Sequence, residues 1–240
     1  MRNIVIIKTN INAKENPTML EKIKDTVKEI LKDCAHDYDH TLRVYNNCML
    51  IAKSEQGANL EVLKVASLLH DIARAREDSD DSGKTDHAIL GADMAYSILR
   101  SEGYDEKFAQ DVKYVISTHR YRADNPPATL EAKILFDADK LDALGAIGIA
   151  RSFAIAGKVG ETLYYYGSTE DYVKDNLVGG KIGGRIKDIS KHSFQMEYEL
   201  KFKLLPEKMY THTAKQIAKT RLEFMETFIE QMIDEINGVS

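Results

Sequence analysis

An apolar helical run, VLKVASLLHDIA, ends in the pair His70-Asp71, and this pair restricts how the chain can fold. The run predicts a helix buried in the core, over about residues 59–75. A buried imidazole and carboxylate need compensating partners, because burying even one neutral polar group without a hydrogen bond costs about 2–7 kcal/mol. A divalent cation would compensate both groups. A cation with open coordination positions would in turn suggest hydrolysis.

Helical periodicity recurs along most of the chain. The apolar residues of MLEKIKDTVKEIL are spaced as on one helix face after Pro17, which predicts an amphipathic helix over about residues 18–33. Further helices are expected over about residues 37–54, 87–102, 105–118 and 130–156, and two more, separated near Pro206, over about residues 193–236. No run outside the amino-terminal MRNIVIIKTNIN, for which we expect an extended segment or arm, favours a strand. The sequence therefore predicts an all-α fold.

The length and composition of the chain favour one domain. Its 240 residues, 43% hydrophobic and 30% charged, are typical of a soluble globular protein. We expect a single domain over residues 1–240, with its core motifs at 34–156 and additional carboxy-terminal helices at about 193–237. Between them, residues 157–192 contain many glycines and charges and predict an irregular flap or insertion. Long irregular segments inside compact domains are commonly functional.

Charge and composition argue against several kinds of partner. The net charge of −5 offers no basic face for a nucleic-acid polymer. No apolar stretch approaches the roughly 20 residues of a membrane span, and the amino-terminal segment lacks the cleavage site of a secretory signal. The two cysteines, Cys34 and Cys48, follow no metal-binding spacing and are expected to be reduced thiols. We expect a cytoplasmic protein that is a monomer or a homodimer.

Two imidazoles and two carboxylates on three predicted helices indicate a metal site. These residues are His40 in HDYDHTLRV, the pair His70 and Asp71, and Asp139 in ILFDADKLDALGAIGIAR. A single buried histidine is usually a hydrogen-bonded core residue, so the evidence is the joint placement of the four in apolar surroundings. Such a ligand set suits Mn²⁺, Fe²⁺, Co²⁺, Ni²⁺ or Zn²⁺, and it also admits Mg²⁺.

The strings HDYDHTLRV, SLLHDIA and DADKLDALGAIGIAR resemble the motifs of HD-domain phosphohydrolases, in the order H…HD…D over about residues 34–156. The carboxy-terminal pattern ELKFKLL…THTAKQIAKTRLEFM is similar to one bacterial and archaeal branch of that superfamily. The resemblance implies an all-α HD-domain helical bundle. It also implies a divalent metal held by four residues, which are His40, His70, Asp71 and Asp139.

The resemblance further implies hydrolysis of a phosphate ester or anhydride of a small metabolite, with a nucleotide as the expected substrate. Asp139 is preferred to Asp137 because it occupies the aspartate of the family's A-D-x-L element. Asp71 is the expected catalytic pivot, and we expect no separate protein nucleophile. The glycine that often follows the HD pair is absent, since Ile72-Ala73 stand there. This departure leaves the metal ligands intact and weakens assignment to a named subfamily.

Two further histidines, His87 in DHAILGADMAY and His119 in VKYVISTHRYR, extend the order to H…HD…H…H…D. Members of the superfamily with two metals show that general order. His87 and His119 could hold a second metal, contact a phosphate or cap helix ends, and Asp71 could bridge two ions. The six-ligand set keeps open a di-iron oxygenase on the same scaffold, and a non-catalytic HD regulatory module is the other alternative.

Several neighbouring residues are candidates for contacts with the substrate or with the metal ligands. His36 and His40 have the spacing of H-E-x-x-H zinc peptidases, but Asp37 replaces the glutamate that would act as base. We therefore expect His36 and Asp37 to lie beside His40 or on the substrate side. The basic candidates for phosphate binding are Arg43, Lys140 and Arg151, and Lys140 is favoured because it adjoins Asp139.

Overall fold

Residues 18–31, 38–120 and 125–239 are described by a computed structural model in which α-helices predominate. The first group comprises α1 (Met19–Ile30), α2 (Tyr38–Ala52), α3 (Leu60–Leu69), α4 (Arg74–Asp78), α5 (His87–Ser101), α6 (Glu106–Ser117) and α7 (Leu130–Leu141). The second comprises α8 (Gly145–Val159), α9 (Thr169–Asn176), α10 (Phe194–Leu200), α11 (Leu205–Lys208) and α12 (His212–Asn237). Within these ranges the only β pairing is an isolated bridge between Leu177 and Ile186. The all-α prediction is confirmed.

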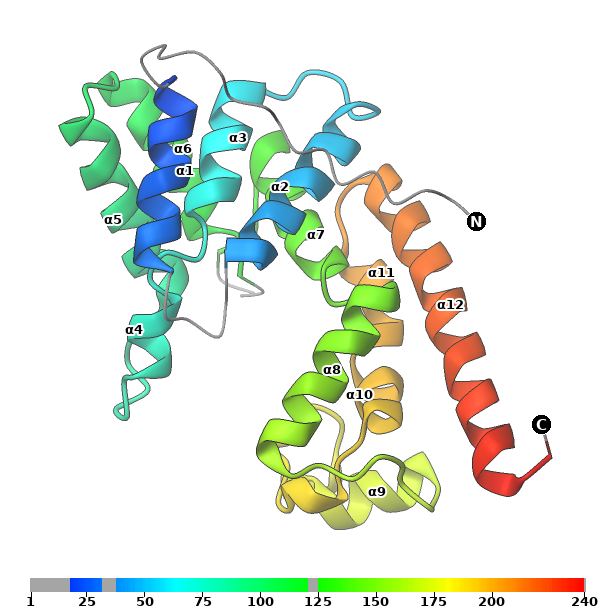
Figure 1. The fold of residues 1–240 in the computed structure, drawn as a ribbon. Helices are drawn as coiled ribbons and strands as arrows, with labels where there is room; N and C mark the ends of the chain where they lie inside the picture. The colour runs from blue at the N-terminus through cyan, green and yellow to red at the C-terminus, as the bar shows by residue number, and fades with distance from the viewer. Residues whose placement is uncertain (1–17, 32–37, 121–124, 240) are drawn as a thin grey trace.

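Helix α3 is the centre of the bundle formed by α1–α7 (Figure 1). It packs against α1, α2, α5, α6 and α7 because it is apolar on nearly every side. Each fully buried leucine or valine stabilises the fold by about 1.5–3 kcal/mol, and α3 buries Val62, Leu63, Val65, Leu68 and Leu69. Its carboxy-terminal end therefore places the residues that follow Leu69 inside the protein.

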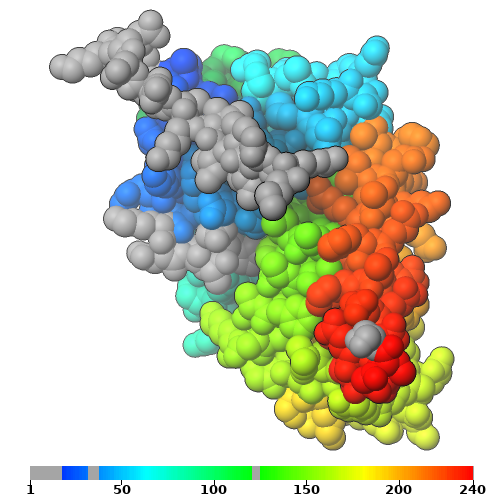
Figure 2. All heavy atoms as spheres, turned by 45° about the vertical axis from the view of Figure 1, so that its right-hand side comes forward, coloured from blue at the N-terminus to red at the C-terminus, as the bar shows by residue number. Residues whose placement is uncertain are grey.

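Helices α8–α11 form what we call the carboxy-terminal lobe (residues 145–208), which lies below the bundle in Figure 1. Helix α12 packs against α7 and α8, and Figure 2 shows it, orange to red, along one side of the molecule. Phe153, Phe194 and Phe228 join α8, α10 and α12 with ring centroids 5.4–6.0 Å apart. The lobe also has a small apolar cluster of its own, built on Tyr172, Leu177 and Met196.

The predicted helix over residues 130–156 was wrong, because the chain forms two helices there. Helix α7 ends at Leu141, and Leu144 before α8 is extended, with φ −115° and ψ 158°. Gly145 has a φ of 74°, a conformation that favours glycine. A Cβ at Gly148 would lie only 2.2 Å from the carbonyl oxygen of Ala143. The two glycines thus permit the turn that directs α8 away from the bundle.

Other predicted boundaries also differ from the structure. The helix expected to carry His70-Asp71 ends at Leu69, and both residues lie in the turn before α4. Residues 157–192 are less irregular than expected, since they contain α9, which begins after the capping hydroxyl of Ser168. The tail contains α10, α11 and α12 in place of two helices, and Pro206 stands in the first turn of α11.

Some sequence-based expectations concern residues that the structure does not describe. The amino-terminal arm, Cys34, His36 and Asp37 lie outside the described residues. Cys48 is a buried free cysteine. Among the described helices, none combines the length and apolarity needed to cross a bilayer.

Candidate metal centre

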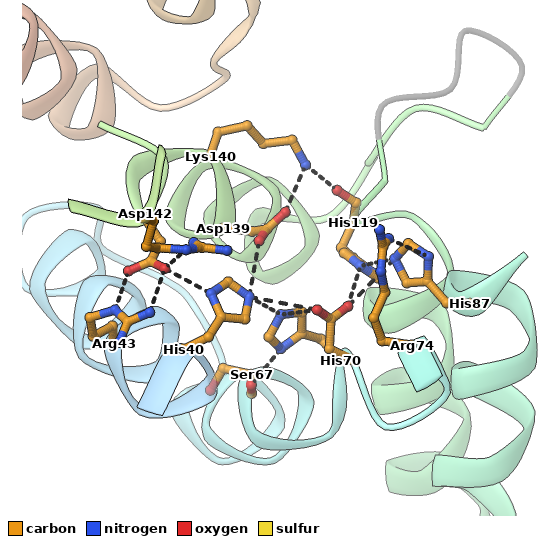
Figure 3. A network of polar contacts seen from close by, with 12 residues as sticks. His40, Arg43, Ser67, His70, Arg74, His87, His119, Asp139, Lys140 and Asp142 are labelled. Atoms are coloured by element: carbon orange, nitrogen blue, oxygen red, sulfur yellow. Dashed lines mark hydrogen bonds and ion pairs between the residues drawn. The ribbon is translucent and has the colours of Figure 1, made fainter. Parts of the chain in front are cut away.

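Four histidines, labelled in Figure 3, lie around the carboxylate of Asp71 where α3 ends. Its Oδ2 lies 3.6 Å from Nε2 of His40 and 3.8 Å from Nε2 of His70. Its Oδ1 lies 3.5 Å from Nε2 of both His87 and His119. The structure therefore brings together residues from α2, the turn after α3, α5 and the end of α6. The two oxygens of Asp71 face two different pairs of imidazoles.

Each of these four imidazoles directs Nδ1 at a hydrogen-bond acceptor. His40 faces Asp142 Oδ2 at 2.8 Å, and His70 faces the Ser67 carbonyl at 2.8 Å. His87 faces Glu77 Oε2 at 2.7 Å, and His119 faces the Ile116 carbonyl at 2.6 Å. Because a neutral imidazole carries one proton, a proton on Nδ1 leaves Nε2 as a bare acceptor. This arrangement is typical of metal-ligating histidines.

The bare nitrogens lie in facing pairs, and this tests whether the residues fit a metal. Nε2 of His40 is 3.4 Å from Nε2 of His70, and Nε2 of His87 is 3.2 Å from Nε2 of His119. With both protons of a pair on Nδ1, neither nitrogen can donate to the other, and all four side chains are buried. A divalent cation between these nitrogens and the Asp71 carboxylate would satisfy all of these acceptors, so the donor set fits one.

Asp139 completes the half of the cluster that contains His40. Its Oδ1 lies 3.5 Å from Nε2 of His40, and its Oδ2 accepts a hydrogen bond from the Lys140 ammonium at 3.2 Å. Lys140 also donates to the His119 carbonyl at 2.5 Å, so it spans the two halves of the cluster. Asp137 lies elsewhere, because its carboxylate accepts hydrogen bonds from the backbone N–H groups of Tyr210 and Thr211 at the start of α12.

Asp142 holds His40 in place together with two arginines. Its Oδ1 accepts from Nε of Arg43 at 2.7 Å, and its Oδ2 accepts from Nη1 of Arg151 at 2.5 Å. Both arginines, expected from the sequence as substrate contacts, therefore have a carboxylate partner beside the cluster. Asp142 itself was not among the residues selected from the sequence. The available signal was a third carboxylate in the apolar run DADKLDALGAIGIA, three residues after Asp139.

Glu77 plays the corresponding part for His87. Its Oε2 accepts a hydrogen bond from His87 Nδ1 and also lies 3.0 Å from Nη1 of Arg74. Its Oε1 accepts a hydrogen bond from Arg120 at 2.5 Å. The Arg74 guanidinium is farther from His87 Nδ1, at 3.2 Å, than the carboxylate is. Glu77 was not selected from the sequence, because it stands in a polar segment, REDSDDSGKTD.

The electrostatic environment favours neutral imidazoles at His70 and His87 and an ionised carboxylate at Asp142, whereas it favours the protonated form of His40. Burial lowers the pKa of His70 to about 4 and also lowers the pKa of His87. For His40, burial is outweighed by the hydrogen bond to Asp142 and by nearby carboxylates, which raise its pKa. Burial opposes ionisation of Asp142, but its hydrogen bonds with His40 and Arg43 lower its pKa to about 2. Metal binding requires such deprotonated imidazoles and carboxylates.

A cavity of about 810 Å³ opens beside the His40 half of the cluster. His40, Asp139 and Lys140 line it on the bundle side, and Arg151 lines it from α8. Its other walls come mainly from the carboxy-terminal lobe, including residues 182–184 of the glycine-rich segment that we predicted as a flap. The volume is within the range of small-molecule sites. The arrangement places a candidate cation site at one end of a space large enough for a small metabolite.

Comparison with known proteins adds independent information. The HD domain family matches residues 37–144. YpgQ of Bacillus subtilis (strain 168) is 30% identical over 225 residues, which cover 91% of this chain and 94% of YpgQ. The crystal structure of YpgQ in complex with ADP superposes with a TM-score of 0.66 and 28% identity, covering 92% of this chain and 96% of that one. An HD-superfamily hydrolase from Bacillus thuringiensis has a TM-score of 0.64 and 32% identity, covering 91% and 96%.

Proposed function

The chain belongs to the HD domain family, and from this premise we propose that it is a metal-dependent phosphohydrolase of a small phosphorylated metabolite. The bond cleaved is a phosphate ester or phosphoanhydride, and a nucleotide is the proposed substrate. The observation that carries the proposal is that four buried Nε2 atoms lie 3.5–3.8 Å from the oxygens of Asp71, next to a cavity that His40 and Asp139 line. The complex of YpgQ with ADP supports a nucleotide.

We assign the metal ligands from the geometry of the cluster. One cation would be held by His40, His70, Asp71 and Asp139, of which His40 and Asp139 line the cavity. A second would be held by Asp71, His87 and His119, with Asp71 between the two ions. Such cations supply Lewis-acid chemistry, in that they lower the pKa of a water molecule and offset negative charge on a phosphoryl oxygen.

The chain's own residues orient these groups and the substrate. Asp71 presents one oxygen to each pair of imidazoles, and Asp142 fixes the ring of His40 through Nδ1. Lys140 and Arg151 line the cavity next to Asp139, so their positive charges would attract the phosphates of the substrate to that end. In the hydrolysis, water adds to phosphorus, the bond to the leaving oxygen breaks, and a proton passes to the leaving group.

The di-iron oxygenase remains the second candidate, because Asp71 faces both His40–His70 and His87–His119. The two functions differ in measurable ways. An oxygenase requires two irons per chain and consumes oxygen with an organic substrate. A phosphohydrolase releases phosphate or pyrophosphate without oxygen, and it works with metals that have no redox role.

The first experiment is to measure metal content per chain and hydrolysis of nucleoside diphosphates and triphosphates, with and without added Mn²⁺. We expect one or two transition-metal equivalents and metal-dependent hydrolysis in the wild type, and loss of both in Asp139→Ala. Asp39→Asn is the matched control, because Asp39 is exposed on α2 directly before His40. Wild-type protein that binds no metal after incubation with Mn²⁺, Ni²⁺ or Fe²⁺ would contradict the proposal.

A further inference from the structure

A second group of polar side chains, which includes the buried Tyr172 and His192, lies beside the same cavity on the side of the carboxy-terminal lobe. The Tyr172 hydroxyl lies 2.6 Å from Nδ1 of His192, and Nε2 of His192 lies 3.3 Å from Oε2 of Glu197. The other oxygen of Glu197 accepts a hydrogen bond from the Lys201 ammonium at 2.7 Å. His192, Glu197 and Lys201 all line the cavity that also contains His40 and Asp139.

This group is held by its own apolar cluster. Tyr172 is fully buried and packs with Leu177 and Met196, while Ile186 and Leu200 pack against them. His192 is 5% exposed, so the pair that it forms with Glu197 is shielded from bulk water. Since one end of the imidazole is fixed by Tyr172, the position of the Glu197 carboxylate relative to the cavity is fixed as well.

We infer that this side of the cavity binds the nucleoside part of the substrate, and that the Glu197 carboxylate accepts hydrogen bonds from neutral O–H or N–H donors of the sugar or the base. The inference rests on the proposed nucleotide substrate. It adds a recognition site that is separate from the metal ligands.

The distribution of charge along the cavity supports this orientation. Among the residues that line it, only Asp139 and Glu197 carry carboxylates, and Asp139 belongs to the candidate metal centre. Lys201 and Lys208 line the cavity as well, and Lys201 pairs with Glu197. The proposed cations beside Asp139, together with Lys140, would attract the phosphates to the end of the cavity that contains Asp139. Glu197 is then left to meet an uncharged donor. Lys201 offsets part of its charge without removing its accepting capacity.

The walls next to Glu197 suit a heterocyclic base. Leu177, Ile186, Leu200 and Leu204 line this side of the cavity and offer apolar surface. The backbone of Gly183 and Gly184 lines it as well, so no side chain narrows the space there. A site with apolar walls and one or two placed polar groups is the usual form of a small-molecule pocket.

Glu197 also has free accepting capacity. A carboxylate offers about four lone-pair positions, and the described contacts to His192 and Lys201 use two of them. Burial opposes ionisation of this carboxyl group, but the hydrogen bond with His192 and the charge of Lys201 lower its pKa to about 2. The group is therefore an ionised acceptor at neutral pH, and hydrogen bonds to ionised acceptors are stronger than those to neutral ones.

The test is calorimetric binding of ADP and of inorganic pyrophosphate to the Mn²⁺-loaded protein, in wild type and Glu197→Gln. We expect Glu197→Gln to weaken ADP binding about tenfold or more, as expected when a hydrogen bond to a charged group is lost, and to change pyrophosphate binding less than twofold. Glu199→Gln is the matched control, since Glu199 lies on the same helix, pairs with Lys203 and does not line the cavity. It should leave both ligands unaffected.

The two probes separate this inference from the proposed function. Unchanged ADP affinity in Glu197→Gln, or a change of equal size for ADP and pyrophosphate, would overturn the inference while leaving phosphohydrolysis intact. Tighter binding of pyrophosphate by the variant would also overturn it, because Glu197 would then face phosphate. Failure of the wild type to bind either probe would refute the proposed function and this inference together. Unaltered pyrophosphate affinity shows that the variant is folded at the metal centre.

Two further ligands identify the donor. If the 2′-hydroxyl is the donor, wild type and Glu197→Gln will bind 2′-deoxyADP with equal affinity. If the 6-amino group of the base is the donor, the two proteins will bind inosine diphosphate with equal affinity. If Glu197→Gln weakens the binding of both ligands as much as that of ADP, the donor is the 3′-hydroxyl. Each of these outcomes supports recognition of the nucleoside by Glu197, provided that the loss of ADP affinity is observed.

Discussion

Two regions of the molecule bury histidine beside carboxylate, and they use it differently. Around Asp71, each of four imidazoles directs Nδ1 at a hydrogen-bond acceptor. The Nε2 atoms of these rings face each other in two pairs, at 3.4 Å and 3.2 Å. In the carboxy-terminal lobe, both nitrogens of His192 are engaged, one by the Tyr172 hydroxyl and one by Glu197. In the first region the Nε2 atoms face one another and Asp71, whereas in the second a hydroxyl and a carboxylate face the ring from opposite ends. The comparison shows that a buried histidine suggests a metal site when its Nε2 faces other metal-ligating atoms.

The largest effect should come from removing the residue that unites the metal cluster. Asp71→Ala removes the carboxylate that faces all four imidazoles, so we expect metal content to fall close to zero and hydrolysis to fall by at least about 10³-fold. Metal analysis and steady-state rates measure both. The same measurements on His192→Asn should show unchanged metal content. Loss of metal from His192→Asn would remove the distinction between the two regions.

The two regions should also respond to acid in different pH ranges. The pKa of His70 is lowered to about 4 from 6.5, so its unfolded state binds the extra proton first as the pH falls. In metal-free protein the free energy of unfolding should therefore decrease by about 3 kcal/mol between pH 6.5 and 4 because of His70. The pKa of Glu197 is lowered to about 2 from 4.5, so its contribution is lost below pH 4.5.

Urea unfolding followed by circular dichroism in EDTA checks this assignment. The difference between His70→Gln and wild type should change with pH between 6.5 and 4, and the difference between Glu197→Gln and wild type should change below 4.5. If the free energy of unfolding of a variant and of the wild type changed equally with pH, between 6.5 and 4 for His70→Gln or below 4.5 for Glu197→Gln, the assigned pKa shift would be contradicted. Both differences have the same sign, since in each range the unfolded state binds more protons than the folded state.

A smaller effect is expected where a carboxylate acts on the metal only through a ligand. Asp142→Asn keeps the shape of the side chain but weakens its hold on His40 Nδ1, so metal affinity should fall by about 10–100-fold. Competition with a chelating dye measures the affinity, and Asp39→Asn serves as the exposed control. An affinity equal to that of the wild type would show that Asp142 does not position His40.

The sequence predicted most helices because apolar spacing is a local property. The helix expected over residues 105–118 is observed as Glu106–Ser117, and the one expected over 87–102 as His87–Ser101. The break after Leu141 was missed, because the pattern of apolar residues continues through it. It depends on the conformation of Gly145 and on the close approach at Gly148, which spacing does not reveal.

The candidate site shows a similar division. The resemblance supplied His40, His70, Asp71, His87, His119 and Asp139, and the structure brings all six together. Asp142 and Glu77 were missed because their role depends on contacts distant in sequence. Asp142 meets His40 across 102 residues, and Glu77 meets Arg120 across 43. Neither contact leaves a pattern within a single helix.

The sequence by itself determined the helical class and the set of residues that can carry chemistry, because periodicity and residue type are written along the chain. Only the tertiary structure decided which nitrogen of each imidazole faces Asp71 and which acceptors hold the rings in place. It alone joined the metal cluster and the His192–Glu197 pair to one cavity. These features depend on directions and distances between helices, and packing around α3 and the turn at Gly145 sets them.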